Sequence, residues 1–338
     1  SWDAEGLVTP LDNLLTTNNI DVNDIYQAPI AQCKDNKGRI LCLPWGNDVY
    51  ALFWNKDLFE EAGLDPESPP KTMEDLVVFA DKLTKKGDNG KLTQVGFIPD
   101  FSWSHTDLYV TMLGGYWYSP DGMQLTANSQ PMIDALKWQQ QFYTKYGADD
   151  VLSFTSALGG YMSPDQGFYA GKIAMMVDGE WQVGPNFIQQ YKPELNYGVA
   201  AFPPPADHPE RAGTVVSQGT VAMIPSGVKD EDASAKLLAW MMSPEILAEE
   251  MVANYNLPTS TKSAADPRFR ENAKFVLFMD LMAGKNAKPA LTTPITAELS
   301  EAMGQVEEQV LHAGKDPVPL LNEVQAKFES MLTDALKK

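Results

Sequence analysis

The sequence has few of the side chains that clamp anionic ligands or hold metal ions. Arginine occurs at only four positions, Arg39, Arg211, Arg268 and Arg270, and none stands beside the aromatic stretches described below. Because the guanidinium group is the usual clamp for carboxylate and phosphate, its scarcity favours a neutral ligand. Two cysteines and three histidines argue against a zinc site, and we expect neither a metal nor a cofactor.

Motifs that define several enzyme classes are also missing. The chain has no Gly-x-Ser-x-Gly elbow, no glycine-rich phosphate loop and no dinucleotide fingerprint. No apolar run is long enough to span a bilayer, and no charged-then-apolar signal segment is visible at the start. A formal charge of −19 disfavours nucleic acid and anionic membranes as partners. We therefore expect a binding protein, although counting carboxylates does not exclude a glycoside-active enzyme.

The length and the order of predicted elements indicate the fold class. A chain of 338 residues exceeds one ordinary hydrophobic core, which predicts two domains. Helix and strand patterns alternate along most of the chain, and the part from Pro267 onward is almost entirely helical in pattern. This alternation predicts an α/β fold in which helices pack on largely parallel sheets.

The only two cysteines lie on either side of a turn signal. Cys33 and Cys42 flank the tetrapeptide 35–38, Asp-Asn-Lys-Gly, whose composition is typical of a turn. A turn there brings the two thiols close together. Two interpretations stay open: a disulfide in an oxidising compartment, or two reduced and unrelated thiols.

The stretch 43–59 is the most informative part of the chain. It begins as a polar, aromatic loop with Trp45, Asn47, Asp48 and Tyr50. The apolar run that follows, 51–54, predicts a strand buried on both faces. Sugars present apolar C–H faces and a rim of hydroxyls, so aromatic rings beside amide and carboxylate groups suit such a ligand.

Three further segments offer the same mixture of aromatic and hydrogen-bonding side chains. They are 100–107 with Trp103 and His105, 175–181 with Glu180 and Trp181, and 216–220 with Ser217 and Gly219. The first two follow predicted strands, where ligands bind in open α/β sheets. Trp181 stands outside any periodic apolar pattern, which favours a ligand contact, whereas Trp138 and Trp240 lie in amphipathic helices and are expected in the core.

Taken together, several motifs resemble the extracellular solute-binding proteins of ABC sugar importers, the family that includes the maltose-binding protein. The matching segments are 6–12, Leu43-Pro-Trp45, Ala51-Leu-Phe-Trp-Asn-Lys-Asp-Leu-Phe59, 69–72, 114–115, Phe168-Tyr-Ala-Gly-Lys-Ile-Ala-Met175, Asp178-Gly-Glu-Trp181 and Leu257-Pro-Thr259. Each motif is weak alone, but together they run over nearly the whole chain in the family's order.

The resemblance implies a type II-like periplasmic-binding-protein fold, in which two α/β lobes close by a hinge motion around a sugar. The implied first lobe comprises 1–48 and 220–265, the second lobe comprises 51–217 and 266–338, and the chain crosses between them near 48–50, 218–221 and 264–267. The implied ligand is a neutral saccharide, expected as an oligosaccharide, and the implied partner is the membrane permease of an ABC importer. We expect a monomer in the periplasm or outside the cell, with a lipid anchor as one option.

Within this resemblance, Trp181 falls where the family places a stacking tryptophan. Trp103 and His105 fall in the segment that carries cleft aromatics, and Tyr255 is a weaker candidate on the first lobe. The strand–helix–strand unit with which family members begin is missing, so we expect the sequence to be part of a longer product. The alternatives are a glycoside-active enzyme with an aromatic cleft, or a two-lobed binder of a polyamine or polyol phosphate.

Overall fold

The apolar run after Asp48 forms strand β3 (Tyr50–Asn55), and all six of its residues are buried. Its side chains alternate between two hydrophobic clusters, with Leu52 and Trp54 in one and Ala51 and Phe53 in the other. The predicted burial on both faces is therefore confirmed. The computed structural model describes residues 5–337, so residues 1–4 and 338, at the outer ends of the predicted lobes, lie outside the described residues.

Strand β3 belongs to a five-stranded sheet with the order β4-β5-β6-β3-β7. The other strands are β4 (Lys85–Lys86), β5 (Leu92–Ser102), β6 (Ile173–Gly179) and β7 (Tyr197–Ala200). Only β5 and β6 pair in parallel, whereas β3 runs antiparallel to both β6 and β7. The expectation of a largely parallel sheet is wrong here, because β3 does not reach the sheet through a βαβ crossover, which would fix its direction.

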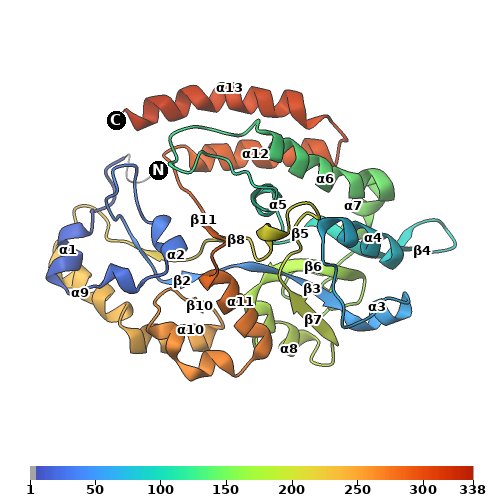
Figure 1. Cartoon of the computed structure of the whole chain (residues 1–338), viewed down its shortest axis with the longest axis horizontal. Coiled ribbons are helices and arrows are strands. Elements are labelled where there is room, and N and C mark those ends of the chain that lie inside the picture. The colour runs from blue at the N-terminus through green and yellow to red at the C-terminus, as the bar shows by residue number, and fades with distance from the viewer. Residues whose placement is uncertain (1–4, 338) are drawn as a thin grey trace.

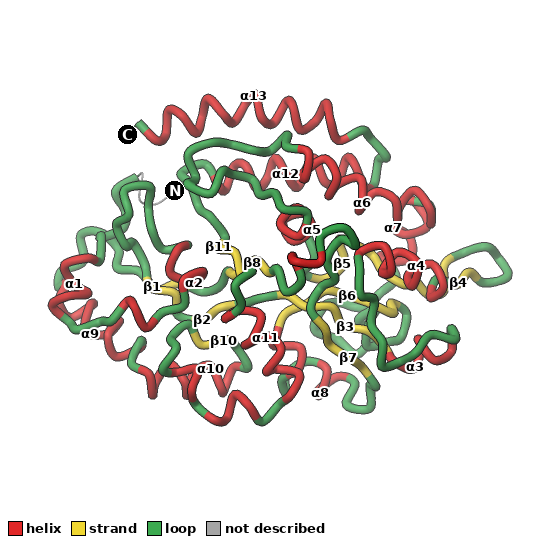
Figure 2. The backbone as a smooth tube through the Cα atoms, viewed as in Figure 1, coloured by secondary structure: helices red, strands yellow, loops and turns green. Residues whose placement is uncertain are grey.

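Three short strand pairs join segments that are far apart in the sequence (Figure 2). They are β1 (Leu43–Pro44) with β9 (Val221–Ala222), β2 (Gly46–Asn47) with β10 (Leu257–Pro258), and β8 (Val215–Ser217) with β11 (Ala287–Pro289). An isolated bridge between Asp48 and Gln218 continues the same region. The Asp48–Gln218 bridge joins two of the three segments that the sequence predicts to link two lobes, whereas the third, 264–267, takes no part in these pairings.

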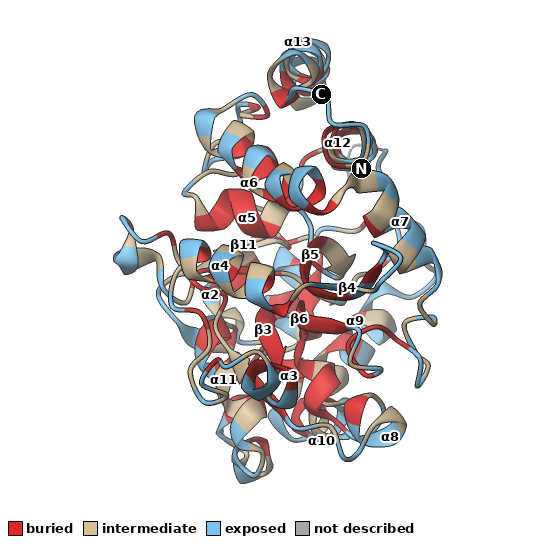
Figure 3. Ribbon diagram, turned by 90° about the vertical axis from the view of Figure 1, so that its right-hand side faces the viewer, coloured by how far each residue is buried: buried red, intermediate tan, exposed pale blue. Residues whose placement is uncertain are grey.

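The helices cover both faces of the main sheet (Figure 1). The first cluster includes residues of α3 (Lys56–Glu61), α4 (Met73–Leu83), α5 (Thr106–Met112), α6 (Gln130–Tyr146), α7 (Ala148–Ser156), α12 (Thr296–Leu311) and α13 (Pro317–Leu336). The second includes residues of α1 (Asp12–Thr17), α2 (Gln27–Ala31), α8 (Ile188–Tyr191), α9 (Glu231–Met241), α10 (Pro244–Asn254) and α11 (Ala273–Ala283). Of these, α11 packs beside β7, whereas α1, α2, α9 and α10 lie around the short strand pairs, away from the main sheet. Figure 3 shows β3, β5, β6 and α5 as largely buried, while β4 and the outer helices are exposed in whole or in part.

Cys33 and Cys42 are joined by a disulfide, with a Cα–Cα distance of 5.0 Å. The turn between them is closed by the Asp35 carboxylate, which accepts hydrogen bonds from the backbone N–H groups of Lys37 at 2.9 Å and Arg39 at 2.8 Å. The Asx-type turn expected from the tetrapeptide therefore places the two sulfur atoms within bonding reach.

The C-terminal helices are tied to the main sheet through Asp100 at the end of β5. His312, which follows α12, places Nε2 3.0 Å from one Asp100 carboxylate oxygen, and the Tyr143 hydroxyl of α6 donates to the other at 2.6 Å. The hydrogen bond to Asp100 raises the pKa of His312 above its usual value of 6.5, with Glu307 and Glu308 adding to the rise.

This contact predicts a pH-dependent contribution to stability. Because the folded-state pKa of His312 is raised, the contribution is complete below about pH 6.5 and disappears as pH rises through the folded-state pKa. We expect wild type to lose up to about 1 kcal/mol of unfolding free energy over this rise, since the pair is partly exposed. His312→Gln should lack that step in urea unfolding from pH 5.5 to 8.5. Parallel pH profiles for the two proteins would contradict the prediction.

Candidate functional site

A cavity of about 440 Å³ lies where the linking segments meet, and we call it the cleft cavity. Its lining comes from the end of α2, from the segments 48–50 and 218–219, from the end of β5 with α5, and from the segment 290–300 that leads into α12. The lining residues are Gln32, Asp48, Tyr50, Trp103, Asp107, Tyr116, Trp117, Gln218, Gly219, Ala290, Leu291, Thr292, Thr296 and Ser300. The cavity is thus bordered by elements on both sides of the Asp48–Gln218 bridge.

The cleft cavity combines aromatic rings with hydrogen-bonding groups of both kinds. Asp48 and Asp107 supply carboxylates, and no lysine or arginine is among the described residues that line it. Gln32 Nε2 and Trp117 Nε1 are buried donors without a hydrogen-bond partner in the described part of the chain. A ligand that satisfies both sets must offer donors and acceptors together, as hydroxyl groups do.

Burial controls the electrostatics of this cavity. It raises the pKa of Asp48, against the hydrogen bonds that Asp48 makes to Asn256 and Glu180, and it raises the pKa of Asp107, against the charge of His105. Burial also raises the pKa of Tyr50, and the charges of Asp48 and Asp107 raise it further. Asp48, Asp107 and Tyr50 all line the cleft cavity, and the charged groups of its lining are acidic.

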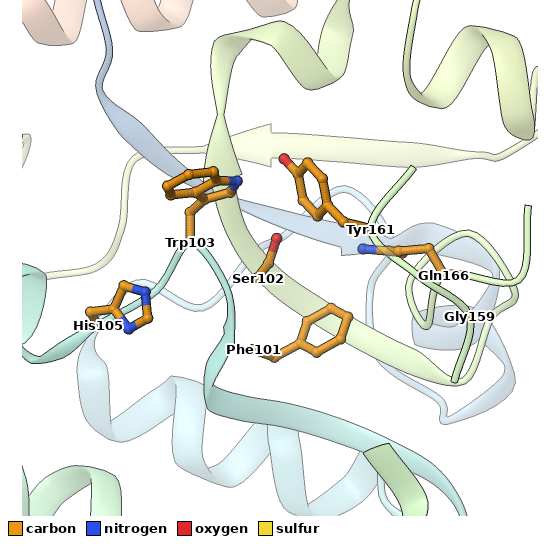
Figure 4. A pocket seen from close by; sticks show the side chains of 7 residues that line it. All are labelled: Phe101, Ser102, Trp103, His105, Gly159, Tyr161 and Gln166. Carbon is orange, nitrogen blue, oxygen red and sulfur yellow. The ribbon is translucent and has the colours of Figure 1, made fainter. Parts of the chain in front are cut away.

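A second cavity of about 480 Å³ adjoins the end of β5. It is lined by Phe101, Ser102, Trp103, His105, Gly159, Tyr161 and Gln166 (Figure 4). Figure 4 shows Trp103, Ser102 and Tyr161 grouped together, with Gln166 beyond Tyr161 and His105 on the opposite side of Trp103. Trp103 lines both cavities, and its side chain is 46% exposed.

Trp103 belongs to an aromatic cluster that also contains Tyr50, Tyr161 and Trp181. The Trp181 ring lies edge-on to Trp103 at 5.9 Å and to Tyr50 at 6.1 Å between centroids. Trp181 Nε1 donates to the Tyr161 hydroxyl at 2.6 Å. Trp181 is partly exposed and is not among the lining residues of either cavity, and its ring packs edge-on against Trp103 and Tyr50.

Asp178 anchors this cluster from below. It is fully buried at the end of β6, and it accepts hydrogen bonds from the hydroxyls of Ser102 and Tyr161, from Gln182 Nε2 and from the backbone N–H of Gly179. Burial raises the pKa of Asp178 to about 6, against these four hydrogen bonds. Asp178 thus holds Ser102 and Tyr161, which line the second cavity, to the end of β6.

Glu180 lies in a buried node where the linking segments cross. Asn256 Nδ2 donates to Asp48 Oδ1 at 2.6 Å and to Glu180 Oε1 at 2.8 Å, and the Val49 N–H donates to Glu180 Oε2 at 3.4 Å. Burial, and then the charge of Asp48, raise the pKa of Glu180 well above its usual value. Glu180 therefore connects three segments and is fully buried.

The structure gathers some of the predicted binding residues around the cavities and places others elsewhere. Asp48, Tyr50, Trp103 and Gly219 line the cleft cavity, and His105 lines the second one. The remaining predicted residues, which line neither cavity, are Trp45, Asn47, Glu180, Trp181, Ser217 and Tyr255.

Four of these remaining residues have packing or pairing partners. The Asn47 amide and the Ser217 hydroxyl are fully buried and hydrogen-bond to each other at 2.7 Å. Tyr255 ends α10 in a left-handed conformation with φ of 52°, and its ring packs against Phe275. Trp45 is half-buried against the second hydrophobic cluster.

Several lining residues escaped prediction from the sequence. Asp107 closes the segment 100–107, and Gln218 stands between two predicted residues, so both lay within reach of the same argument. Tyr161 and the segment 290–292 lie in loops, and Thr296 and Ser300 lie in the first two turns of α12; no sequence signal marks any of them. Within residues 5–337, no group of three or more His, Cys, Asp or Glu side chains is arranged to hold a metal ion. No described helix is both long and apolar enough to cross a membrane.

Two α/β lobes with a ring-lined cavity at their linking segments define a two-lobed solute-binding protein. The sequence model of the bacterial extracellular solute-binding protein family matches residues 1–248, and the chain belongs to this family. The resemblance drawn from the sequence motifs is thereby confirmed.

Curated relatives and solved structures extend this assignment. A putative binding protein of Brucella abortus is 23% identical over 309 residues, which cover 87% of this chain and 68% of the relative. The sn-glycerol-3-phosphate-binding periplasmic protein UgpB of Escherichia coli is 27% identical over 238 residues, but these cover only 51% of the relative and 68% of this chain. The structure of CpMnBP1 with mannotriose bound matches with a TM-score of 0.86 and 27% identity, covering 96% of this chain and 82% of that one.

Proposed function

We propose that this protein captures a neutral saccharide in the cleft cavity and delivers it to the membrane permease of an ABC importer, without catalysing a reaction on it. The observation that carries the proposal is the lining of the cleft cavity, where four aromatic rings, two carboxylates and two unpartnered buried donors occur without lysine or arginine. A hydroxylated ring matches all of these groups at once. We further propose that it acts as a monomer in the periplasm or, lipid-anchored, at the cell surface.

The similarity to CpMnBP1 supports a saccharide ligand. That protein has been solved with mannotriose and with mannobiose bound. The two structures are 27% and 28% identical to this chain, and each match covers 96% of this chain. An oligosaccharide of a few units is the ligand class that we therefore favour for this chain.

We place the first lobe at 1–48 and 220–265 and the second at 51–217 and 266–338, with crossings near 48–50, 218–221 and 264–267. The paired backbone of Asp48 and Gln218 supports the first two crossings, since Asp48 N donates to Gln218 O at 2.6 Å. In this division the cleft cavity receives Gln32 from the first lobe and Trp103 from the second. The buried node of Asp48, Glu180 and Asn256 then lies at the hinge.

A polyol phosphate is a second candidate because of the similarity to UgpB. The lining of the cleft cavity speaks against it, since Asp48 and Asp107 would repel a phosphate and no lining residue offers it a positive charge.

Isothermal calorimetry against a panel tests the proposed function. The panel holds neutral mono- and oligosaccharides, sn-glycerol-3-phosphate and putrescine, and a parallel assay follows hydrolysis of p-nitrophenyl glycosides. We expect micromolar or tighter binding to at least one neutral saccharide, no comparable binding to the phosphate or the amine, and no hydrolysis. Binding of sn-glycerol-3-phosphate alone would favour the second candidate, and turnover lost in a single carboxylate variant would favour an enzyme.

A further inference from the structure

Glu180 is a buried carboxyl group to which the proposed saccharide site assigns no contact. It is fully buried directly after β6 and lines neither cavity, but it lies within hydrogen-bond reach of Asp48, which does line the cleft cavity. Asn256 joins the two side chains, because its one amide nitrogen donates to Asp48 Oδ1 at 2.6 Å and to Glu180 Oε1 at 2.8 Å. Two carboxyl groups therefore meet in one small buried space.

The immediate partners of this pair supply hydrogen bonds but no positive charge. They are the Asn256 amide, the backbone N–H of Val49 at 3.4 Å from Glu180 Oε2, and the contact between the two carboxyl groups themselves. Two carboxyl groups form a hydrogen bond with each other only when one of them carries a proton. The geometry of the pair therefore requires a proton on one of its members.

The next groups outward add acidic charge. The Tyr50 hydroxyl on β3 faces Asp48, Glu180 and Asp107 of α5 together, and His105 acts on Asp107. Like charges in a buried site without a bound cation do not both stay ionised, so the pair titrates as a unit. Burial, followed by the charge of Asp48, raises the pKa of Glu180 well above its usual value, which assigns the proton to Glu180.

The pair also lies at the boundary between the proposed lobes. In that division Asp48 and Asn256 belong to the two segments of the first lobe, and Glu180 belongs to the second. The packing around the amide is tight, since a Cβ at Gly46 would collide with the Asn256 side-chain oxygen. A movement between the lobes at this place changes the separation of the two carboxyl groups or admits water to them.

We propose that Asp48 and Glu180 share one proton, and that this proton couples the closure of the two lobes, and hence saccharide binding, to pH. The inference rests on the proposed function and adds Glu180 to it as a positioning residue that does not touch the ligand. With the proton in place, Glu180 holds the Asp48 carboxylate at the wall of the cleft cavity. When the proton is lost, the two carboxylates repel each other across the lobe boundary.

The direction of the pH dependence follows from burial. Closure of the lobes keeps water away from the pair, so the closed form holds the proton more tightly than the open form. Saccharide affinity is therefore complete at low pH and falls as pH rises through the range in which the open form loses the proton. Binding within that range takes up protons from the buffer.

Infrared difference spectroscopy tests the shared proton without any ligand. At about pH 7, the spectrum of wild type minus that of Glu180→Gln should contain the C=O band of a protonated carboxylic acid, and this band should fade as the pH is raised. Glu323→Gln, which changes an exposed glutamate of α13 that lines neither cavity, should give no such band. Only carboxylate bands in the Glu180 difference spectrum would overturn the inference.

Calorimetry with the most tightly bound saccharide tests the coupling. We expect the affinity of wild type to fall at least about tenfold from about pH 6 to about pH 9.5, with proton uptake at the alkaline end in buffers of different ionisation enthalpy. Glu180→Gln, whose amide still donates to Asp48, should bind within about threefold of wild type at about pH 6 and change less than about twofold over the same range. Glu323→Gln should follow wild type throughout.

A wild-type affinity that stays constant, or that falls equally in Glu180→Gln, would overturn the inference and leave the proposed function intact. Binding to wild type without proton uptake would do the same, and this result does not depend on how well the variant folds. Failure of every saccharide to bind at any pH would overturn the proposed function and the coupling together. The infrared band would then still report whether the pair holds a proton.

Discussion

Replacing Asp178 by alanine is expected to lower the free energy of unfolding by about 3 kcal/mol and to weaken saccharide binding at least about tenfold. The reason is that four donors converge on this fully buried carboxylate: Ser102, Tyr161, Gln182 and the Gly179 N–H. Without the acceptor these donors stay buried and unpaired, and each costs about 1–3 kcal/mol unless the site relaxes. Relaxation would release the braced end of β5 and with it Trp103.

Asp178→Asn is the matched variant for this experiment. Its amide oxygen still accepts a hydrogen bond in nearly the same shape, so we expect a smaller loss of both stability and affinity. Urea unfolding measures the first effect and calorimetry the second. An alanine variant as stable as wild type within about 0.5 kcal/mol would show that the network does not hold the aromatic cluster.

Replacing Gly219 by alanine is expected to have the second largest effect, because the added Cβ would overlap backbone. At this position a Cβ would collide with the Gly46 carbonyl oxygen and would lie 2.8 Å from the Asn47 Cα. These atoms belong to the paired linking segments and cannot move away without disturbing the Asp48–Gln218 bridge. We expect a loss of about 1–3 kcal/mol of stability and weaker binding, since Gly219 also lines the cleft cavity.

Gly160→Ala is the control for this substitution, because a Cβ at Gly160 meets no heavy atom within 4 Å and its φ is not in the left-handed region. Thermal unfolding should separate the two variants clearly. Equal melting temperatures for Gly219→Ala and Gly160→Ala would contradict the close approach of the two linking segments.

The sequence predicted correctly those features that depend on neighbouring residues alone, such as the burial of a strand or the start of a helix. The apolar run of β3 is buried on both faces, as expected. The spacing of Thr72 and Asp75 in the sequence predicts a capping box, and the two residues form one at the start of α4. Strand direction was not predictable in this way. The antiparallel pairing of β3 depends on how the chain arrives from the other lobe, and no residue of β3 encodes that.

The burial of tryptophan side chains could not be predicted reliably from the periodicity of the sequence. Trp240 was expected in the core, but only Ala235 and Leu238 of α9 are buried, and Trp240 lies on the outward face. Trp181 is predicted as a ligand contact because it stands outside any apolar pattern, and this stays a prediction. The structure adds that its ring packs edge-on against Trp103, the tryptophan that lines both cavities. Whether a ring supports or contacts a ligand depends on tertiary packing, which periodicity does not report.

The buried node at the hinge was only partly within reach of the sequence. Asp48 and Glu180 stood out because each follows or precedes a strand beside aromatic residues. Asn256, which donates to both, carries no such signal in the turn after α10. Its position depends on three segments meeting, which the sequence alone does not reveal.

A crystal structure of the protein with the saccharide that binds most tightly in the calorimetric panel tests the proposed binding site most directly. We expect a sugar ring in the cleft cavity, with hydroxyl groups within hydrogen-bond distance of Asp48 or Asp107 and a ring face against Trp103. Gln32 Nε2 or Trp117 Nε1 should then have gained an oxygen partner. A saccharide bound outside this cavity, with no contact to Asp107 or Trp103, would contradict the proposal that the cleft cavity is the binding site.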